Sequence, residues 1–181
     1  MDTALLVIDI QDSFQAVPGR WASRNNPKLE ANVLELIAAF RDASLPVIFF
    51  LHTDSDPGFR KTDPEFRLMD FLGRREDELL LIKNTRNAFT STDLQQRLDA
   101  MGVRRLVIAG ISTEQCCETT ARVAADLGYD VDFVTEATAT FPVGGFTADE
   151  IVARTEAVLD KRFARIRKVS EVKEGLLVSA T

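Results

Sequence analysis

Short apolar runs alternate along this chain with longer segments in which apolar residues recur every three or four positions. The runs have the length of buried strands, and the longer segments have the spacing of amphipathic helices. Strands are predicted at residues 4–10, 47–51, 79–82, 105–109, 131–135 and 163–169, and helices at about 26–44, 92–101, 112–128 and 147–159. This alternation predicts βαβ units, and therefore a doubly wound, mostly parallel six-stranded sheet of α/β class with helices on both faces.

Three of the predicted helices begin at a Ser or Thr that is followed three residues later by Gln or Glu. The pairs are Ser112 with Gln115, Thr92 with Gln95 and Thr147 with Glu150. Each pair has the spacing of a capping box, in which two side chains satisfy free N–H groups of the first helical turn. These pairs therefore predict where the three helices start.

Two segments follow neither pattern. Residues 53–78 mix proline, glycine and many charges, with a short helix expected around residues 66–72. A long connection inside a compact domain is commonly functional or a lid. The pattern assigns no element to residues 170–181.

Length and charge narrow the class of protein. A chain of 181 residues suits one domain, residues 1–181. Its net charge of −6 argues against a nucleic-acid surface, and no apolar run is long enough to span a membrane. The two cysteines are adjacent, which fits a reducing compartment better than a disulfide framework. The residues before the first strand have no basic segment or cleavage site, so no signal peptide is expected. These features predict a cytoplasmic protein.

Cys116 is the candidate nucleophile. It follows an apolar strand, Gly110 and a polar turn, and it falls in the first turn of a predicted helix. Free backbone N–H groups and the positive end of the helix dipole there favour the thiolate. The alternative is that Cys116 is a buried cysteine that only packs in the core. This interpretation is preferred for Cys117, because the side chain at the next helical position points about 100° away from that of Cys116.

Asp9 and Lys83 are candidate partners of Cys116, because each ends a predicted strand. If the strands at 4–10 and 105–109 are neighbours, Asp9 and Cys116 face one crevice at the carboxyl edge of the sheet, with Lys83 on the same edge. The single histidine, His52, removes most zinc chemistry and most histidine-based triads. Asp9 would accept the thiol proton, and Lys83 would lower the thiol pKa.

An attack on an amide carbonyl creates an oxyanion. The backbone N–H groups of Ser112 and Cys116 are expected to donate hydrogen bonds to it. Each such donor typically stabilises the transition state by about 3 kcal/mol. Considered alone, Asp9 could also be a structural acid at the end of a strand, and Lys83 could be a solvent-exposed lysine. The prediction of a catalytic site therefore depends on Asp9, Lys83 and Cys116 lying close together.

Four residues are expected to contact a substrate: Phe14, Trp21, His52 and Phe89. Phe14 and Phe89 are favoured over Trp21 and Phe59, because each lies just beyond a catalytic candidate. A lone histidine at a strand end is also often a structural, hydrogen-bonded residue.

Several segments together resemble the isochorismatase-like cysteine hydrolases. They are residues 6–14 (LVIDIQDSF), Lys83 with residues 87–89 (NAF) and 92–94 (TDL), residues 110–116 (GISTEQC) with Arg122, Gly128 and Tyr129, and residues 136–138 (EAT). The resemblance covers nearly the whole chain in order, and the combination of motifs is specific.

The resemblance implies a three-layer α/β/α, Rossmann-like fold and a triad of Asp9, Lys83 and Cys116. It also implies a cis peptide between Ile111 and Ser112, which aims the Ser112 N–H at the oxyanion, and a homodimer or homotetramer. Nicotinamidases of this superfamily hold a metal through an Asp and histidines near the second strand. This chain has only His52 there, so no metal, no cofactor and no nicotinamide substrate are expected.

The sequence thus predicts a hydrolase that cleaves a C–N bond of a small amide, carbamoyl or ureido compound through a Cys116 thioester. Two alternatives stay open. One is isochorismatase-type vinyl-ether hydrolysis, with Asp9 as general acid. The other is a non-catalytic binding module on the same fold.

Overall fold

A six-stranded parallel sheet forms the centre of the computed structural model, which describes residues 2–178. The strands are β1 (Thr3–Ile8), β2 (Val47–His52), β3 (Leu79–Lys83), β4 (Arg105–Ile111), β5 (Asp130–Ala139) and β6 (Arg165–Ile166). Their order across the sheet is β3-β2-β1-β4-β5-β6. The buried strands are apolar along their length, as expected where helices cover both faces of a sheet.

Five α-helices cover the sheet. They are α1 (Leu29–Asp42), α2 (Leu94–Ala100), α3 (Glu118–Asp126), α4 (Ala148–Leu159) and α5 (Val169–Val178). Short 3₁₀ helices occur at Asp12–Gln15, Trp21–Ser23 and Asp70–Leu72, and a π-helical turn at Thr113–Cys117 precedes α3. Within residues 2–178, no helix has the length and apolar character needed to cross a membrane.

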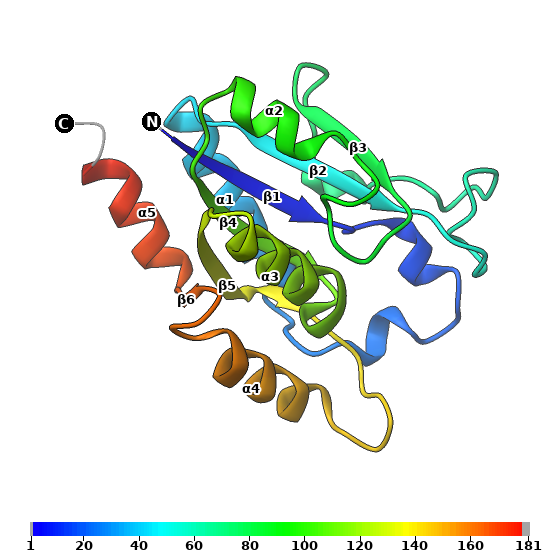
Figure 1. Cartoon of the computed structure of the whole chain (residues 1–181). Coiled ribbons are helices and arrows are strands. Elements are labelled where there is room, and N and C mark those ends of the chain that lie inside the picture. The colour runs from blue at the N-terminus through cyan, green and yellow to red at the C-terminus, as the bar shows by residue number, and fades with distance from the viewer. Residues whose placement is uncertain (1, 179–181) are drawn as a thin grey trace.

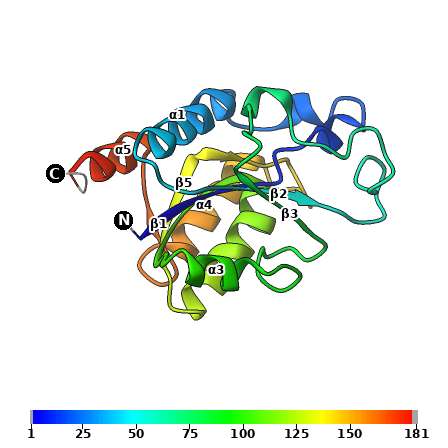
Figure 2. The same cartoon turned by 90° about the horizontal axis from the view of Figure 1, so that it is seen from above.

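The helices divide between the two faces of the sheet (Figures 1 and 2). One apolar cluster packs α1 and α5 against the sheet through residues such as Leu36, Phe40 and Val172. A second cluster packs α2, α3 and α4 on the opposite face, with Leu98, Ala121 and others. The molecule is therefore a three-layer α/β/α sandwich, as the sequence predicts.

The winding reverses between β1 and β4, in the middle of the sheet. The chain proceeds from β1 outward through β2 to β3, and then returns to β4 on the other side of β1. The two central strands are in register, with Ile8 opposite Gly110. A Cβ atom at Gly110 would lie 2.0 Å from the Ile8 carbonyl oxygen, and φ is +138° there, so glycine allows this close approach. The carboxyl ends of β1 and β4 thus form the crevice where such folds bind ligands.

Several local predictions need correction. Of the three capping boxes, only the one formed by Thr147 and Glu150 is present. Ser112 makes no side-chain cap, because its carbonyl accepts the Cys117 N–H across a wider π-helical turn. The Thr92 hydroxyl donates to the Ala88 carbonyl and accepts from the N–H of Leu94, so α2 starts without a Thr92–Gln95 box.

Other boundaries also differ from the sequence pattern. The sixth strand is only two residues long, and β5 extends to Ala139 through an irregularity in its pairing with β4. The 53–78 segment contains only the short helix Asp70–Leu72 as regular structure. The unassigned tail forms α5, while residues 179–181 lie outside the described part of the chain.

Candidate active site

Asp9, Lys83 and Cys116 meet at the crevice between β1 and β4. Asp9 directly follows β1, Lys83 is the last residue of β3, and Cys116 lies in the turn after β4. Lys83 stands beside His52 in the register of β3 and β2, and its long side chain reaches past the end of β2 to Asp9. The Lys83 Nζ atom lies 2.7 Å from Asp9 Oδ2, and the exposed fractions of the two side chains are 0% and 1%.

Both carboxylate oxygens of Asp9 are buried. Oδ2 forms the ion pair with Lys83, and apart from that contact neither oxygen is satisfied by a hydrogen bond among residues 2–178. A carboxylate oxygen of Asp9, the Sγ atom of Cys116 and a ring nitrogen of His52 all lie within 4.8 Å of one another. Asp9 therefore presents an open acceptor close to the thiol.

Charge and burial set the protonation of this cluster. Burial and the negative charge of Asp9 raise the pKa of the Cys116 thiol to about 12, although the cation of Lys83 acts in the opposite direction. Burial lowers the pKa of Lys83, but the negative charge of Asp9 and the interaction with Cys116 outweigh this and raise it. At neutral pH the lysine is charged and the thiol is protonated, contrary to the sequence prediction of an activated thiolate.

Hydrogen bonds hold the turn that carries Cys116. The Thr120 hydroxyl donates to the carbonyl of Cys116 at 2.6 Å, and Thr113 donates to the Thr138 hydroxyl of β5 at 2.9 Å. Glu118, the first residue of α3, is buried and accepts from Thr155 of α4 at 3.0 Å. The peptide bond between Ile111 and Ser112, which leads into this turn, is cis.

His52 lies at the end of β2, next to the cluster. Gln11 fixes its backbone, accepting from the His52 N–H at 2.7 Å and donating to its carbonyl at 3.1 Å. Burial and the cation of Lys83 are the main causes that lower the pKa of the His52 ring, so the ring is neutral at pH 7. Sequence reasoning singled out His52, and the structure places it in the pocket wall.

The residues around His52 do not fit a metal centre. Lys83 Nζ lies 3.4 Å from Nδ1 of the ring, and the guanidinium of Arg86 contacts Nε2, which also lies 3.2 Å from Asp54 Oδ2. Both ring nitrogens thus face cations, and Asp9, which together with Cys116 lies within 4.8 Å of the ring, is paired with Lys83. A cation would have to compete with two positive side chains for these ligands.

A pocket of about 90 Å³ opens onto the cluster. Its wall includes the predicted residues Asp9, Phe14, His52, Ser112 and Cys116. It also includes residues that sequence reasoning did not assign to a site, namely Arg20, Asp54, Asp56, Arg86 and Gln115, and Phe59, which it ranked below Phe89. Except for Gln115, which lies in the π-helical turn Thr113–Cys117, these residues come from connections between elements, where no hydrophobic period indicates which side chain turns inward.

Trp21 and Phe89 are not among the residues that line this pocket. The Trp21 ring lies under the Arg24 guanidinium, 4.0 Å from its Cζ atom, and packs against the α1–α5 face of the core. Phe89 is buried on the other face, where it stacks on Tyr129 with ring centroids 5.8 Å apart. Both rings turn back onto the core instead of lining this pocket, although Phe89 follows Lys83 closely in sequence.

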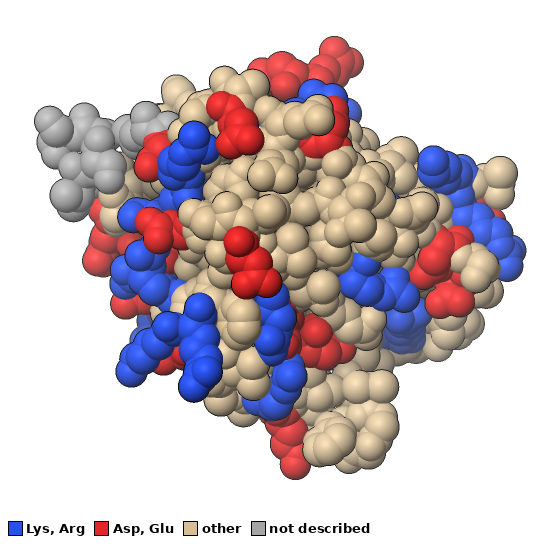
Figure 3. Space-filling view, in the orientation of Figure 1, with Lys and Arg blue, Asp and Glu red and all other residues tan. Residues whose placement is uncertain are grey.

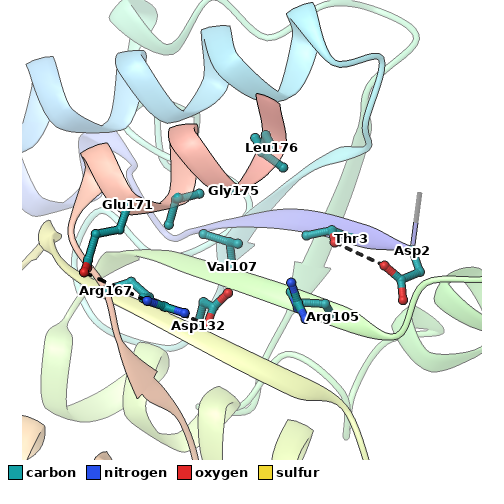
Figure 4. Close-up of a pocket in the computed structure, with 10 residues that line it drawn as sticks. Asp2, Thr3, Arg105, Val107, Asp132, Arg167, Glu171, Gly175 and Leu176 are labelled. Carbon is teal, nitrogen blue, oxygen red and sulfur yellow. Dashed lines mark hydrogen bonds and ion pairs between the residues drawn. The ribbon is translucent and has the colours of Figure 1, made fainter. Parts of the chain in front are cut away.

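A second hollow, of about 110 Å³, lies at the opposite edge of the sheet beneath α5 (Figure 4). Its charged groups pair with one another, since Arg167 lies 3.7 Å from Asp132 and 3.9 Å from Glu171. Among residues 2–178, the wall of the hollow contains neither cysteine nor histidine. The chemistry therefore concentrates at the carboxyl edge of the sheet.

On the face that Figure 3 shows, positive and negative side chains are interspersed around a broad area without charge. Together with the net charge of −6, this distribution does not resemble the basic stripe that nucleic-acid-binding proteins present.

Known proteins share both the sequence and the fold of this chain. The family model described as Isochorismatase domain matches residues 3–167. Nicotinamidase 3 of Arabidopsis thaliana is 37% identical over 153 residues, covering 76% of this chain and 73% of the relative. Ureidoacrylate amidohydrolase of Acinetobacter baylyi is 27% identical over 163 residues, covering 70% and 66%.

A solved structure agrees with these matches. A protein of the isochorismatase family from Chromobacterium violaceum has a TM-score of 0.90 and 30% identity, covering 98% of this chain and 94% of that one. The family model, the relatives and the shared fold show that this chain belongs to the isochorismatase family of hydrolases.

Proposed function

We propose that this protein hydrolyses a C–N bond of a small amide, carbamoyl or ureido compound through a thioester at Cys116. The observation that supports this most is the convergence of Asp9, Lys83 and Cys116, which are 74 and 33 residues apart in sequence. Asp9 and Cys116 line one pocket, and Lys83 Nζ lies 2.7 Å from Asp9 Oδ2. The names of the two relatives, a nicotinamidase and an amidohydrolase, agree with this class of reaction.

In the first half of the proposed reaction, Asp9 accepts the thiol proton as Sγ attacks the substrate carbonyl carbon. Because the thiol pKa is raised to about 12, attack and proton transfer are coupled, and the Asp9 carboxylate is the proton acceptor. The carbonyl oxygen becomes an oxyanion, which the backbone N–H groups of Ser112 and Cys116 would receive. The C–N bond then breaks, and the protonated Asp9 gives its proton to the leaving nitrogen.

In the second half, Asp9 removes a proton from water, and the resulting hydroxide attacks the thioester carbonyl. The C–S bond breaks, Sγ recovers a proton from Asp9, and a carboxylic or carbamic acid leaves. Lys83 stays charged throughout and holds Asp9 in place through their 2.7 Å contact. No step needs a metal or a cofactor.

Ammonia release from a panel of amides, ureas and carbamates tests this proposal. Cys116→Ala is expected to abolish turnover, and intact-protein mass spectrometry of the wild type is expected to detect the acyl group on Cys116 during turnover. Cys117→Ala is the matched control and should retain activity, since Cys117 is fully buried behind the nucleophile. Full activity of Cys116→Ala on a substrate would contradict the covalent route.

A second candidate function is vinyl-ether hydrolysis of the isochorismatase type, with a protonated Asp9 as general acid. The position of Asp9 in the pocket wall favours it, because that reaction uses the Asp9 carboxyl group and needs no thiolate. The same Cys116→Ala variant separates the two, since it should remain active only in vinyl-ether hydrolysis.

A further inference from the structure

Arg20 occupies an unusual position in the wall of the catalytic pocket. Its guanidinium carbon lies 5.2 Å from the ring centroid of Phe14, 5.3 Å from that of Phe141 and 6.0 Å from that of Phe59. The rings also contact one another, since Phe14 stacks on Phe141 and meets Phe59 edge to face. Three aromatic rings thus hold this cation in place on its 3₁₀-rich connection after β1.

Arg20 has no anionic partner among residues 2–178. Arg86, on the same pocket wall, lies 3.7 Å from Asp54, and Arg24, four residues beyond Arg20, lies 3.7 Å from Glu30. For Arg20 the structure records ring contacts but no side-chain hydrogen bond or ion pair. Its five N–H donors are therefore available to a ligand in the pocket. A carboxylate would accept two hydrogen bonds from them, which the aromatic rings cannot do.

The size of the pocket restricts what such a ligand can be. Arg20 and Cys116 line the same hollow of about 90 Å³. A cavity of roughly 150 Å³ accommodates benzene, so only a few non-hydrogen atoms can separate the group at Arg20 from the group at Cys116. The other charged groups of the wall are Asp9, Asp54, Asp56 and Arg86. Asp9 is paired with Lys83 and Asp54 with Arg86, while Asp56 is exposed.

We propose that Arg20 binds a carboxylate of the substrate, so that the enzyme acts on short amide or ureido acids rather than on neutral amides. This inference rests on the proposed C–N hydrolysis at Cys116. The fork of the guanidinium makes two parallel hydrogen bonds to the carboxylate, and the aromatic cage fixes its direction. The scissile carbonyl, one or two carbons away, is thereby held at the nucleophile.

Binding to a Cys116→Ala background tests the proposal without requiring turnover. The probes are malonamate and succinamate, each compared by calorimetric titration with its neutral analogue of nearly equal shape, malonamide or succinamide. The acid is expected to bind about 10- to 100-fold tighter than the diamide, which is the range for hydrogen bonds to a charged group. Arg20→Gln should reduce this ratio to about one, and Arg20→Lys should retain part of it.

Arg24→Gln is the matched control, because Arg24 is a cation on the same connection that contacts an aromatic ring but does not line the pocket. It should leave the ratio of acid to diamide unchanged. The ratio is internal to each variant, so a loss of stability after removal of Arg20 from its three rings does not affect the conclusion. A thermal unfolding curve for each variant verifies that it is folded.

Three results would overturn the role of Arg20. They are an acid-to-diamide ratio near one in the Cys116→Ala parent, a ratio that persists in Arg20→Gln, or no binding of either acid. Failure of the proposed reaction looks different, because the binding preference for acids would then persist while the wild type releases no ammonia from any of the four probes.

Discussion

The reactivity of Cys116 gives a sharp test of the electrostatics of the site. With a pKa of about 12, roughly one Cys116 side chain in 10⁴ is a thiolate at pH 8. An exposed cysteine with a pKa of about 8.5 is roughly one quarter ionised at that pH. Since the thiolate is the reactive form, iodoacetamide should modify Cys116 on the order of 10³-fold more slowly than a simple thiol.

The two charged neighbours of Cys116 make separate contributions of opposite sign. Asp9 raises the thiol pKa, so Asp9→Asn should accelerate alkylation at a fixed pH. Lys83 lowers it, so Lys83→Met should slow alkylation further. Each unit of pKa change corresponds to a tenfold change in thiolate, and the two variants should therefore move in opposite directions.

The assay follows the mass of the intact protein during alkylation, in a Cys117→Ala background with N-acetylcysteine as reference thiol. The rate should rise about tenfold for each pH unit, without a plateau below about pH 10. The Cys116 side chain is 6% exposed, and this poor access lowers the alkylation rate by the same factor at every pH. The pH at which the rate reaches its plateau therefore still reports the pKa of the thiol. A plateau near neutral pH, with a rate above that of the reference, would refute this reasoning.

Four further predictions concern stability, measured by urea unfolding. Lys83→Met should cost about 3–5 kcal/mol, because it leaves Asp9 buried and unpaired, and the double variant with Asp9→Asn should cost less than the sum of the single changes. Because the pKa of Lys83 is raised above its ordinary 10.5, the stabilisation from this pair should be complete below that pH and lost as the pH rises through the folded value. Gly110→Ala should cost about 1–3 kcal/mol or prevent folding, more than Gly102→Ala, since the new Cβ meets backbone at 2.0 Å only at Gly110. Thr147→Ala should cost about 1 kcal/mol by removing the capping box of α4, and an unchanged midpoint would contradict that role.

Much of the fold follows from local sequence. The apolar runs and helical periods predict six strands alternating with helices, and the family model and fold comparison confirm the predicted family and class. The strand order is confirmed where it matters, because β1 and β4 are neighbours and bring Asp9 and Cys116 to one crevice. Chain direction alone places the ends of parallel strands at one edge, so these residues can be proposed from sequence.

Local sequence determined less about the turns and loops. Ser112 and Gln115 have capping-box spacing, yet the turn after β4 opens into a π-helical form held by Thr113 and Thr120. Residues 170–178 lack a clear pattern and still form α5, because the sheet face beside α1 offers an apolar surface on which to pack. Tertiary contacts supply the free energy that decides such segments.

The sequence by itself determined the layers, the central strands and the three residues that end at one edge of the sheet. Only the tertiary structure decided the protonation of Cys116, because burial and the distance to Asp9 and Lys83 set its pKa, and neither can be read along the chain. Only the tertiary structure placed Arg20 in the pocket and left Phe89 and Trp21 out of it. The physical reason is the same in each case: periodicity reports which face of a helix or strand is buried, whereas the charge and direction of a loop side chain depend on contacts between distant segments.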